Sequence, residues 1–135
     1  MATKSVTKYL GVERALLQAL NTRDEKAAAA MLADDFEQKT PIREQAAAGD
    51  DWLAEELKKP HAGERVRDLT VLEEGDIAIV SFMLESPPPK DGKGKAAPSY
   101  FVVDIWKQSS GKLVARYMDM PSNAPPFHAG PNTRE

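Results

Sequence analysis

The sequence of 135 residues has no cysteine and only two histidines. Without cysteine the chain forms no disulfide, and it offers no thiolate as a nucleophile or metal ligand. His61 and His128 lie far apart, and neither is expected to have a carboxylate at ligand spacing. Because a catalytic zinc usually takes three protein ligands, we expect no metal and no cofactor.

The sequence also lacks a strong excess of one charge and any long apolar run. The formal net charge is −3 and the sequence pI is about 5.5, so nothing indicates a nucleic-acid partner. Residues 1–20 contain the acidic Glu13 and no uninterrupted apolar stretch, which argues against a signal peptide or a membrane span. We therefore expect a cytoplasmic protein that binds neither nucleic acid nor membrane.

Helical periodicity dominates the start of the chain. Apolar residues recur at steps of three and four, which predicts a first helix over Ser5–Leu20 that stops at Asn21. Thr22 and Glu25 have the spacing of a capping box, which predicts a second helix over 23–33.

A short strand and a third helix are predicted next. The acidic pair at 34–35 is expected to end the second helix and to lead into a strand over 36–40. The third helix is expected to be capped by Asp50 or Asp51 and to run as far as Lys59, because a proline follows.

The second half of the chain reads as four strands joined by turns. These segments are rich in Val, Ile and aromatic residues, and they cover 65–72, 77–85, 100–108 and 112–120. Residues 87–97 begin with three prolines and read as a long hairpin loop. The pattern predicts an α+β domain over 1–121, with helices on one face of a mostly antiparallel sheet, and an irregular tail over 122–135.

The strand over 100–108 is apolar on both faces. Phe101, Val103 and Ile105 alternate with the opposite set of residues, whereas a sheet with one wet face alternates apolar with polar side chains. The second face needs a cover, and the simplest cover is another copy of the chain. We therefore expect a homodimer through this outer face.

Three segments in order resemble one known superfamily. They are the opening "ALNTRD" with "MLADDF", the strand "FVVDIWK", and the strand "GKLVARYMDMP". This combination resembles the NTF2-like domains, which include ketosteroid isomerases and SnoaL-type polyketide cyclases. The resemblance implies a cone, also called cystatin-like, in which N-terminal helices pack on a curved sheet around a pocket.

The residues that the two enzyme groups use are mostly absent. Aligned with the ketosteroid isomerases, Thr40 takes the place of the base, and Leu16 takes the place of the oxyanion-hole tyrosine. Only the aspartate of that site is present, as Asp104. A neutral hydroxyl does not remove a proton from carbon without an activating partner, so ketosteroid isomerase activity is not expected.

The cyclase pattern also fails at its last strand. Where the cyclases often have a His-Trp-Asp triplet, this chain has Arg116, Tyr117 and Met118. Asp119 could replace the acid only after a slip of one residue, which would turn it to the other face of the strand. Arg116 and Met118 are therefore expected inside the cone.

Strand alternation places Asp104 on one face together with Tyr100, Val102 and Trp106. A three-residue loop at 109–111 would set Asp104 opposite Arg116, whereas a two-residue turn would separate them. The pair is then either a structural ion pair or a donor site for a carboxylate or enolate of a ligand. An enzyme built on an unfamiliar site would use Asp104, Arg116 and Tyr100.

The remaining inward residues predict an apolar cavity with few polar groups, as small-molecule sites usually have. The candidate lining residues are Leu16, Phe36, Gln38, Thr40, Trp52, Phe82, Leu84, Tyr100, Val102, Asp104, Trp106, Arg116 and Met118. Three functions remain open on this basis. The domain binds a small apolar or aromatic molecule, or it is a cyclase, isomerase or dehydratase with a non-standard site, or it is a dimerising interaction module with a filled cavity.

Overall fold

The computed structural model describes residues 3–40, 46–87 and 99–119. The predicted loop at 87–97 lies outside these residues except for Pro87, and so does the predicted tail. The elements in chain order are α1 (Lys4–Asn21), α2 (Glu25–Ala30), β1 (Leu32–Lys39), β2 (Ala47–Ala48), α3 (Gly49–Lys58), β3 (Arg65–Glu74), β4 (Ile77–Glu85), β5 (Tyr100–Lys107) and β6 (Lys112–Met118).

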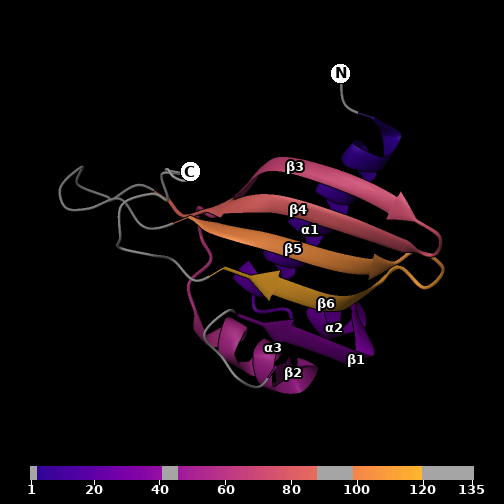
Figure 1. Ribbon diagram of the computed structural model, residues 1–135. Helices are drawn as coiled ribbons and strands as arrows, with labels where there is room; N and C mark the ends of the chain where they lie inside the picture. The colour runs from indigo at the N-terminus through magenta and orange to yellow at the C-terminus, as the bar shows by residue number, and fades with distance from the viewer. Residues whose placement is uncertain (1–2, 41–45, 88–98, 120–135) are drawn as a thin grey trace, which may run out of the picture.

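The strands form one six-stranded sheet in the order β2-β1-β6-β5-β4-β3. β1 pairs with β6 in parallel, and the other pairs are antiparallel. In Figure 1 the sheet curves, α1 crosses behind it, and α3 lies beside β1. The α+β class and the four strands of the second half are confirmed, with strand ends that differ from the prediction by two residues at most.

α1 forms where the apolar periodicity predicts a helix. The Thr3 side chain accepts a hydrogen bond from the amide of Val6 at 3.1 Å and so caps its first turn. At the other end the Thr22 hydroxyl donates to the carbonyl of Gln18 at 2.9 Å. Thr22 therefore closes the first helix.

The prediction for the second helix was wrong at both ends. Its N-cap is Asp24, whose carboxylate accepts from the amide of Ala27 at 3.1 Å, because Thr22 is already engaged with α1. Arg23 has a φ of 57°, in the left-handed region, which separates the two helices. The strand β1 then starts at Leu32, so the acidic pair at 34–35 lies within a strand and does not end a helix.

The cap predicted for the third helix was also wrong. α3 begins at Gly49, its N-cap is Ala48, and no side chain caps it. Asp50 and Asp51 lie in the first turn instead, where negative charge is favourable beside the helix N-terminus. The helix ends at Lys58, one residue before the predicted end.

The connection between β5 and β6 sets Asp104 opposite Arg116 through a four-residue turn and a β-bulge. Lys107 pairs with Lys112, so four residues form the turn, and Gly111 takes a φ of 71° there. A register shift between Ile105 and Trp106 adds one residue to β6, as a β-bulge does. Neither the three-residue loop nor the two-residue turn considered from the sequence is present, but the bulge places Asp104 opposite Arg116.

The core lies between the helices and the inner face of the sheet. Along β4, the alternate residues Ala78, Val80, Phe82 and Leu84 are buried, and α1 contributes residues at three- and four-residue steps. Among the described residues, the buried apolar core is Tyr9, Leu16, Ala19, Leu20, Ala28, Leu32, Phe36, Trp52, Leu53, Ala78, Val80, Phe82, Leu84, Val102, Trp106 and Leu113.

Candidate functional site

Asp104 and Arg116 form a bidentate ion pair inside the cone. The Arg116 Nε donates to Asp104 Oδ1 at 2.8 Å, and its Nη2 donates to Oδ2 at 2.7 Å. Asp104 is fully buried, and Arg116 is 5% exposed. Because a lone buried charge is costly, each group holds the other in place.

Glu13 on α1 is a third member of this cluster, which was not predicted from the sequence. It is 2% exposed and accepts a hydrogen bond from the indole of Trp106 at 2.9 Å. Its other oxygen lies 3.4 Å from Arg116 Nη2. The available signal was its spacing, because Glu13 interrupts the apolar stripe formed by Tyr9, Leu16 and Leu20.

Two carboxyl groups share one guanidinium here, so one carboxyl group favours its protonated form. Burial raises the pKa of Glu13 well above its usual range, and the neighbouring Asp104 raises it further. Arg116 and the Trp106 indole act in the opposite direction but do not offset burial. Burial alone would lower the pKa of Arg116, but the attraction of Asp104 outweighs this and raises it.

Aromatic rings cover the guanidinium on the sides that the carboxylates leave free. Its central carbon lies 5.4 Å from the centroid of the Trp52 ring and 5.9 Å from that of Phe82. The Trp52 ring in turn packs against Phe36 at a centroid distance of 5.1 Å. Arg116, which β6 carries, is thereby enclosed by groups from four other elements, α1, α3, β4 and β5.

Almost no open space remains beside this cluster. The inner void, lined by Glu13, Leu16, Leu17, Leu20, Glu56, His61, Val66, Phe82, Leu84 and Arg116, has a volume of about 10 Å³. That is about the space of a single water molecule. An organic ligand therefore has no room beside Arg116 in this conformation.

A larger space lies beside the end of the sheet where β5 begins and β6 ends. These strand ends are on the left in Figure 1. This mouth cavity has a volume of about 390 Å³ and is bounded by α3 and by the ends of β1, β4, β5 and β6. It is lined by Gln38, Thr40, Ala47, Asp51, Trp52, Glu55, Glu56, Lys59, Pro60, His61, Glu64, Leu84, Tyr100 and Met118. Exposed residues of α3 such as Asp51 and Glu55 form part of the wall, so the cavity reaches the surface.

The structure distributes the predicted lining residues over three places. Six line the mouth cavity: Gln38, Thr40, Trp52, Leu84, Tyr100 and Met118. Leu16, Phe82 and Arg116 line the inner void, as does Leu84. Phe36, Val102, Asp104 and Trp106 line neither space and belong to the packed interior.

The polar wall of the mouth cavity was not predicted. Asp51, Glu55, Glu56 and Lys59 project from α3 and the residue that follows it, and Glu64 lies shortly before β3. Their spacing was the available signal, because residues three and four apart share one face of a helix. The cavity is therefore more polar than the apolar pocket that the sequence analysis expected.

His61 lies between two of these acidic residues, which corrects the expectation that no carboxylate is near it. Its Nδ1 is 2.7 Å from Glu64 Oε1, and its Nε2 is 2.8 Å from the carbonyl oxygen of Glu56. Both ring nitrogens face acceptors, so the imidazolium form satisfies both contacts. The hydrogen bond with Glu64 raises the pKa of His61, although burial acts against it.

Within residues 3–40, 46–87 and 99–119, no group of three or more His, Asp or Glu side chains has an arrangement that could hold a metal ion. No helix in the same ranges is long and apolar enough to cross a membrane.

Comparison with known proteins identifies the family. The SnoaL-like domain matches residues 13–116, which is most of the chain. The protein belongs to the SnoaL-like family. No curated protein matches the chain.

Solved structures confirm the NTF2-like fold. An NTF2-like protein of unknown function from Pseudomonas putida has 18% identity and a TM-score of 0.67, with 91% of each chain covered. A protein of unknown function with a cystatin-like fold from Nostoc punctiforme has 19% identity and a TM-score of 0.66, covering 94% of this SnoaL-like chain and 100% of its own. The CaMKII hub homology domain of Chlamydomonas reinhardtii has 16% identity and a TM-score of 0.70, with 89% and 100% covered. At these identities the similarity concerns the fold.

The raised pKa of Glu13 predicts a stability that falls as pH rises. The protonated form is favoured in the folded state, so its contribution is present below the ordinary pKa of 4.5 and is lost as pH rises through the folded pKa. Glu13→Gln keeps an acceptor for Trp106 and cannot ionise. Urea unfolding between about pH 5 and about pH 8 should show a decline with pH that is shallower in Glu13→Gln, by at most about 1.36 kcal/mol per pH unit.

Glu13→Leu is the matched control for that experiment. It also cannot ionise, but it leaves the Trp106 indole without its acceptor, so it should be less stable than Glu13→Gln at every pH. His61 also has a raised pKa and is present in all three proteins, so the differences between them report on Glu13. Parallel pH curves for the wild type and Glu13→Gln would show that Glu13 is ionised in the fold.

Removal of the guanidinium should be strongly destabilising. Arg116→Ala leaves the fully buried Asp104 without its cation, so we expect a loss of about 3 kcal/mol in the free energy of unfolding. Adding Asp104→Asn to Arg116→Ala removes the uncompensated charge and should restore part of that loss. A loss below about 1 kcal/mol, typical of a surface pair, would contradict the structural role.

Proposed function

We propose that this SnoaL-like domain binds a small organic molecule in the mouth cavity. The observation that carries the proposal is a cavity of about 390 Å³, which is within the range of small-molecule sites, in a cone whose interior is otherwise filled. Leu84, Met118 and the Trp52 ring offer apolar contact, and Gln38 and Tyr100 offer polar groups beside them. An apolar or aromatic body with a polar end fits this lining.

A catalytic role built on Asp104 and Arg116 has less support. The two groups satisfy each other at 2.7 and 2.8 Å, and neither lines the mouth cavity. A group that acts on a substrate must come within hydrogen-bond reach of it. Thr40 and Tyr100 do line the cavity, but no base in contact with the Thr40 hydroxyl is present among the described residues. We therefore assign the ion pair a structural role.

The test of the proposed site is ligand binding observed at the two tryptophans. Trp52 lines the mouth cavity, whereas Trp106 is hydrogen-bonded to Glu13 in the interior, so their indole N–H signals in an NMR spectrum separate the two places. In a screen of small neutral, cationic and anionic organic molecules, binders should shift the Trp52 signal. Ala47→Phe narrows the cavity and should abolish these shifts.

Ala54→Phe is the control for that variant. Ala54 is exposed on the solvent side of α3 and does not line the cavity, so the same added ring should leave binding unchanged. Shifts that survive in Ala47→Phe would place the ligand elsewhere. A screen in which no molecule moves the Trp52 signal would overturn the proposed site.

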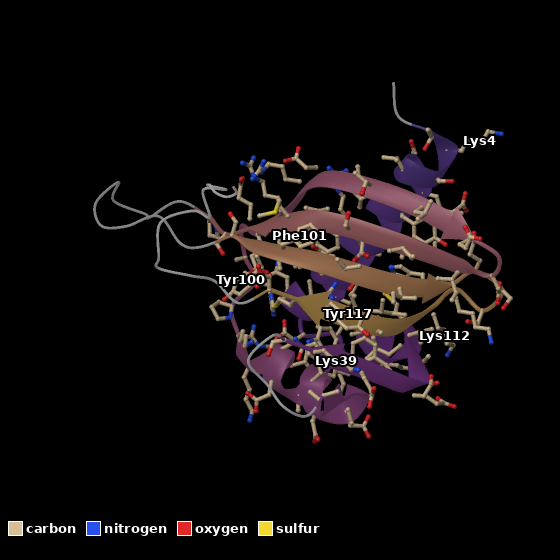
Figure 2. All side chains as sticks on the ribbon, viewed as in Figure 1. Lys4, Lys39, Tyr100, Phe101, Lys112 and Tyr117 are labelled. Carbon is tan, nitrogen blue, oxygen red and sulfur yellow. The ribbon has the colours of Figure 1, made fainter. Side chains whose placement is uncertain are left out.

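We further propose a homodimer through the outer face of the sheet. Phe101 is 46% exposed and Tyr117 is 42% exposed, and both lie on the near side of the sheet in Figure 2, away from α1. Together with Val103, Lys39, Thr40, Met118 and Asp119 they border a shallow, mainly apolar depression. Soluble monomers rarely leave a wide apolar patch in water, and a second copy would cover it.

Sedimentation measures this association directly. The wild type should be dimeric at micromolar concentration, and Phe101→Lys combined with Tyr117→Lys should be monomeric because it places two charges in the interface. Ala54→Lys, on the solvent side of α3, should remain dimeric. A monomeric wild type at that concentration would contradict the proposal.

A further inference from the structure

The mouth cavity contains a buried acceptor that no described residue engages. Gln38 is 5% exposed and lines the cavity. Its amide nitrogen lies 3.4 Å from the carbonyl oxygen of Lys39, which is a long hydrogen bond. Its side-chain carbonyl oxygen has no partner among residues 3–40, 46–87 and 99–119. Buried polar groups are nearly always hydrogen-bonded to protein or to water, so this oxygen is open to a donor that enters the cavity.

The pairing of the strands fixes the Gln38 side chain on the inner face. Gln38 pairs with Arg116 across the parallel β1–β6 ladder and with Ala47 on the other side. It therefore belongs to the row of inward residues that includes Arg116 and Asp104. The guanidinium donates to Asp104 and Glu13, and no bond to Gln38 is among its contacts.

The wall formed by α3 adds an excess of negative charge. Four carboxylates line the cavity, whereas its cationic side chains are Lys59 and His61. Each of these two already has a carboxylate partner: Lys59 Nζ lies 2.9 Å from Glu56, and His61 lies 2.7 Å from Glu64. Glu55 pairs with Lys58, whose Nζ lies 3.7 Å away outside the lining, whereas Asp51 has no cationic partner among the described residues. The lining therefore keeps an excess of negative charge, which repels anions and attracts a positive charge.

Apolar surface borders the same acceptors. Leu84 is buried, Met118 and Tyr100 are half-buried, and all three line the cavity. One part of the Trp52 ring is occupied by Arg116 and Phe36, so Trp52 contributes apolar area and is not a free face for a second cation. Figure 2 shows Tyr100 at the end of β5 that borders the cavity.

We infer that the mouth cavity takes an organic amine, whose cationic N–H groups donate to the Gln38 carbonyl and to carboxylates of the α3 wall while its apolar body lies on Leu84 and Met118. The inference rests on the proposed small-molecule site and specifies the ligand class for it. The charges exclude an organic anion as the preferred ligand, and the unused acceptor favours a donor over an aprotic molecule.

Three probes of the same shape test the ligand class. These are 2-phenylethylamine, 2-phenylethanol and 3-phenylpropanoate, which carry a cation, a neutral hydroxyl and an anion on one phenyl body. In titrations followed by the Trp52 indole signal, the amine should bind about tenfold more tightly than the alcohol, and the carboxylate should bind most weakly. The Trp106 signal should not move.

Two substitutions test the acceptors. Gln38→Met keeps the length of the side chain but removes the carbonyl, and it should weaken amine binding about tenfold. Asp51→Asn removes an exposed charge and should weaken it about threefold. Glu37→Gln is the control: it removes one charge from the exposed face of β1 beside Gln38 and should leave binding unchanged. Asp51→Asn lies at the surface, so it tests the inference even where Gln38→Met fails to fold.

The outcomes separate this inference from the proposed function. If the alcohol or the carboxylate binds as tightly as the amine, or if Asp51→Asn and Glu37→Gln behave alike, the amine is the wrong class and the small-molecule site still stands. If none of the three probes moves the Trp52 signal at millimolar concentration and the broader screen also finds no binder, both proposals fail.

Discussion

The burial of Arg116 is the constraint on which the interior of this domain depends. A guanidinium cannot lose its proton, so the fold must supply negative charge and hydrogen-bond acceptors around it. Asp104 supplies both from the neighbouring strand, and Glu13 reaches the same group from α1. The rings of Trp52 and Phe82 cover the remainder. Contacts with this one cation thereby connect two helices with three strands of the sheet. The packing of the interior is arranged so that each side of the guanidinium has a partner.

The same arrangement decides where a ligand can go. Because Arg116 and its partners fill the inner cone, only about 10 Å³ is open there, whereas about 390 Å³ is open at the end of the sheet. Acid–base groups placed deep in the cone would have no substrate beside them. Glu56, His61 and Leu84 line both spaces, so they separate the closed interior from the open mouth.

Much of the fold and part of the site could be predicted from the sequence. Strand alternation correctly set Asp104 on an inward face. Asp104 pairs with Arg116 although neither turn length considered from the sequence occurs, because a bulge in β6 adds the residue that restores the register. Such a bulge leaves no mark in composition. Thr22 has the sequence pattern of an N-cap, but its hydroxyl bonds to the end of α1 instead, and Asp24 caps α2. The local sequence is compatible with either role of Thr22, so it could not predict which helix Thr22 would cap.

The residues that were missed share one physical cause: their roles depend on contacts between distant elements. Glu13 and Trp106 are 93 positions apart in the chain, and only the packing of α1 on β5 joins them. The wall of the mouth cavity was missed for a similar reason. In the sequence, the acidic face of α3 looks like the solvent-exposed face of an ordinary helix, and it becomes a cavity wall only because β1 and β5 lie opposite it. A charged helix face costs little in water, but beside a buried acceptor the same face is expected to favour a cationic ligand over an anion. The compared structures share this fold at less than 20% sequence identity. Residues of such a cavity wall can therefore differ between proteins of this fold while the helices and the sheet keep their arrangement.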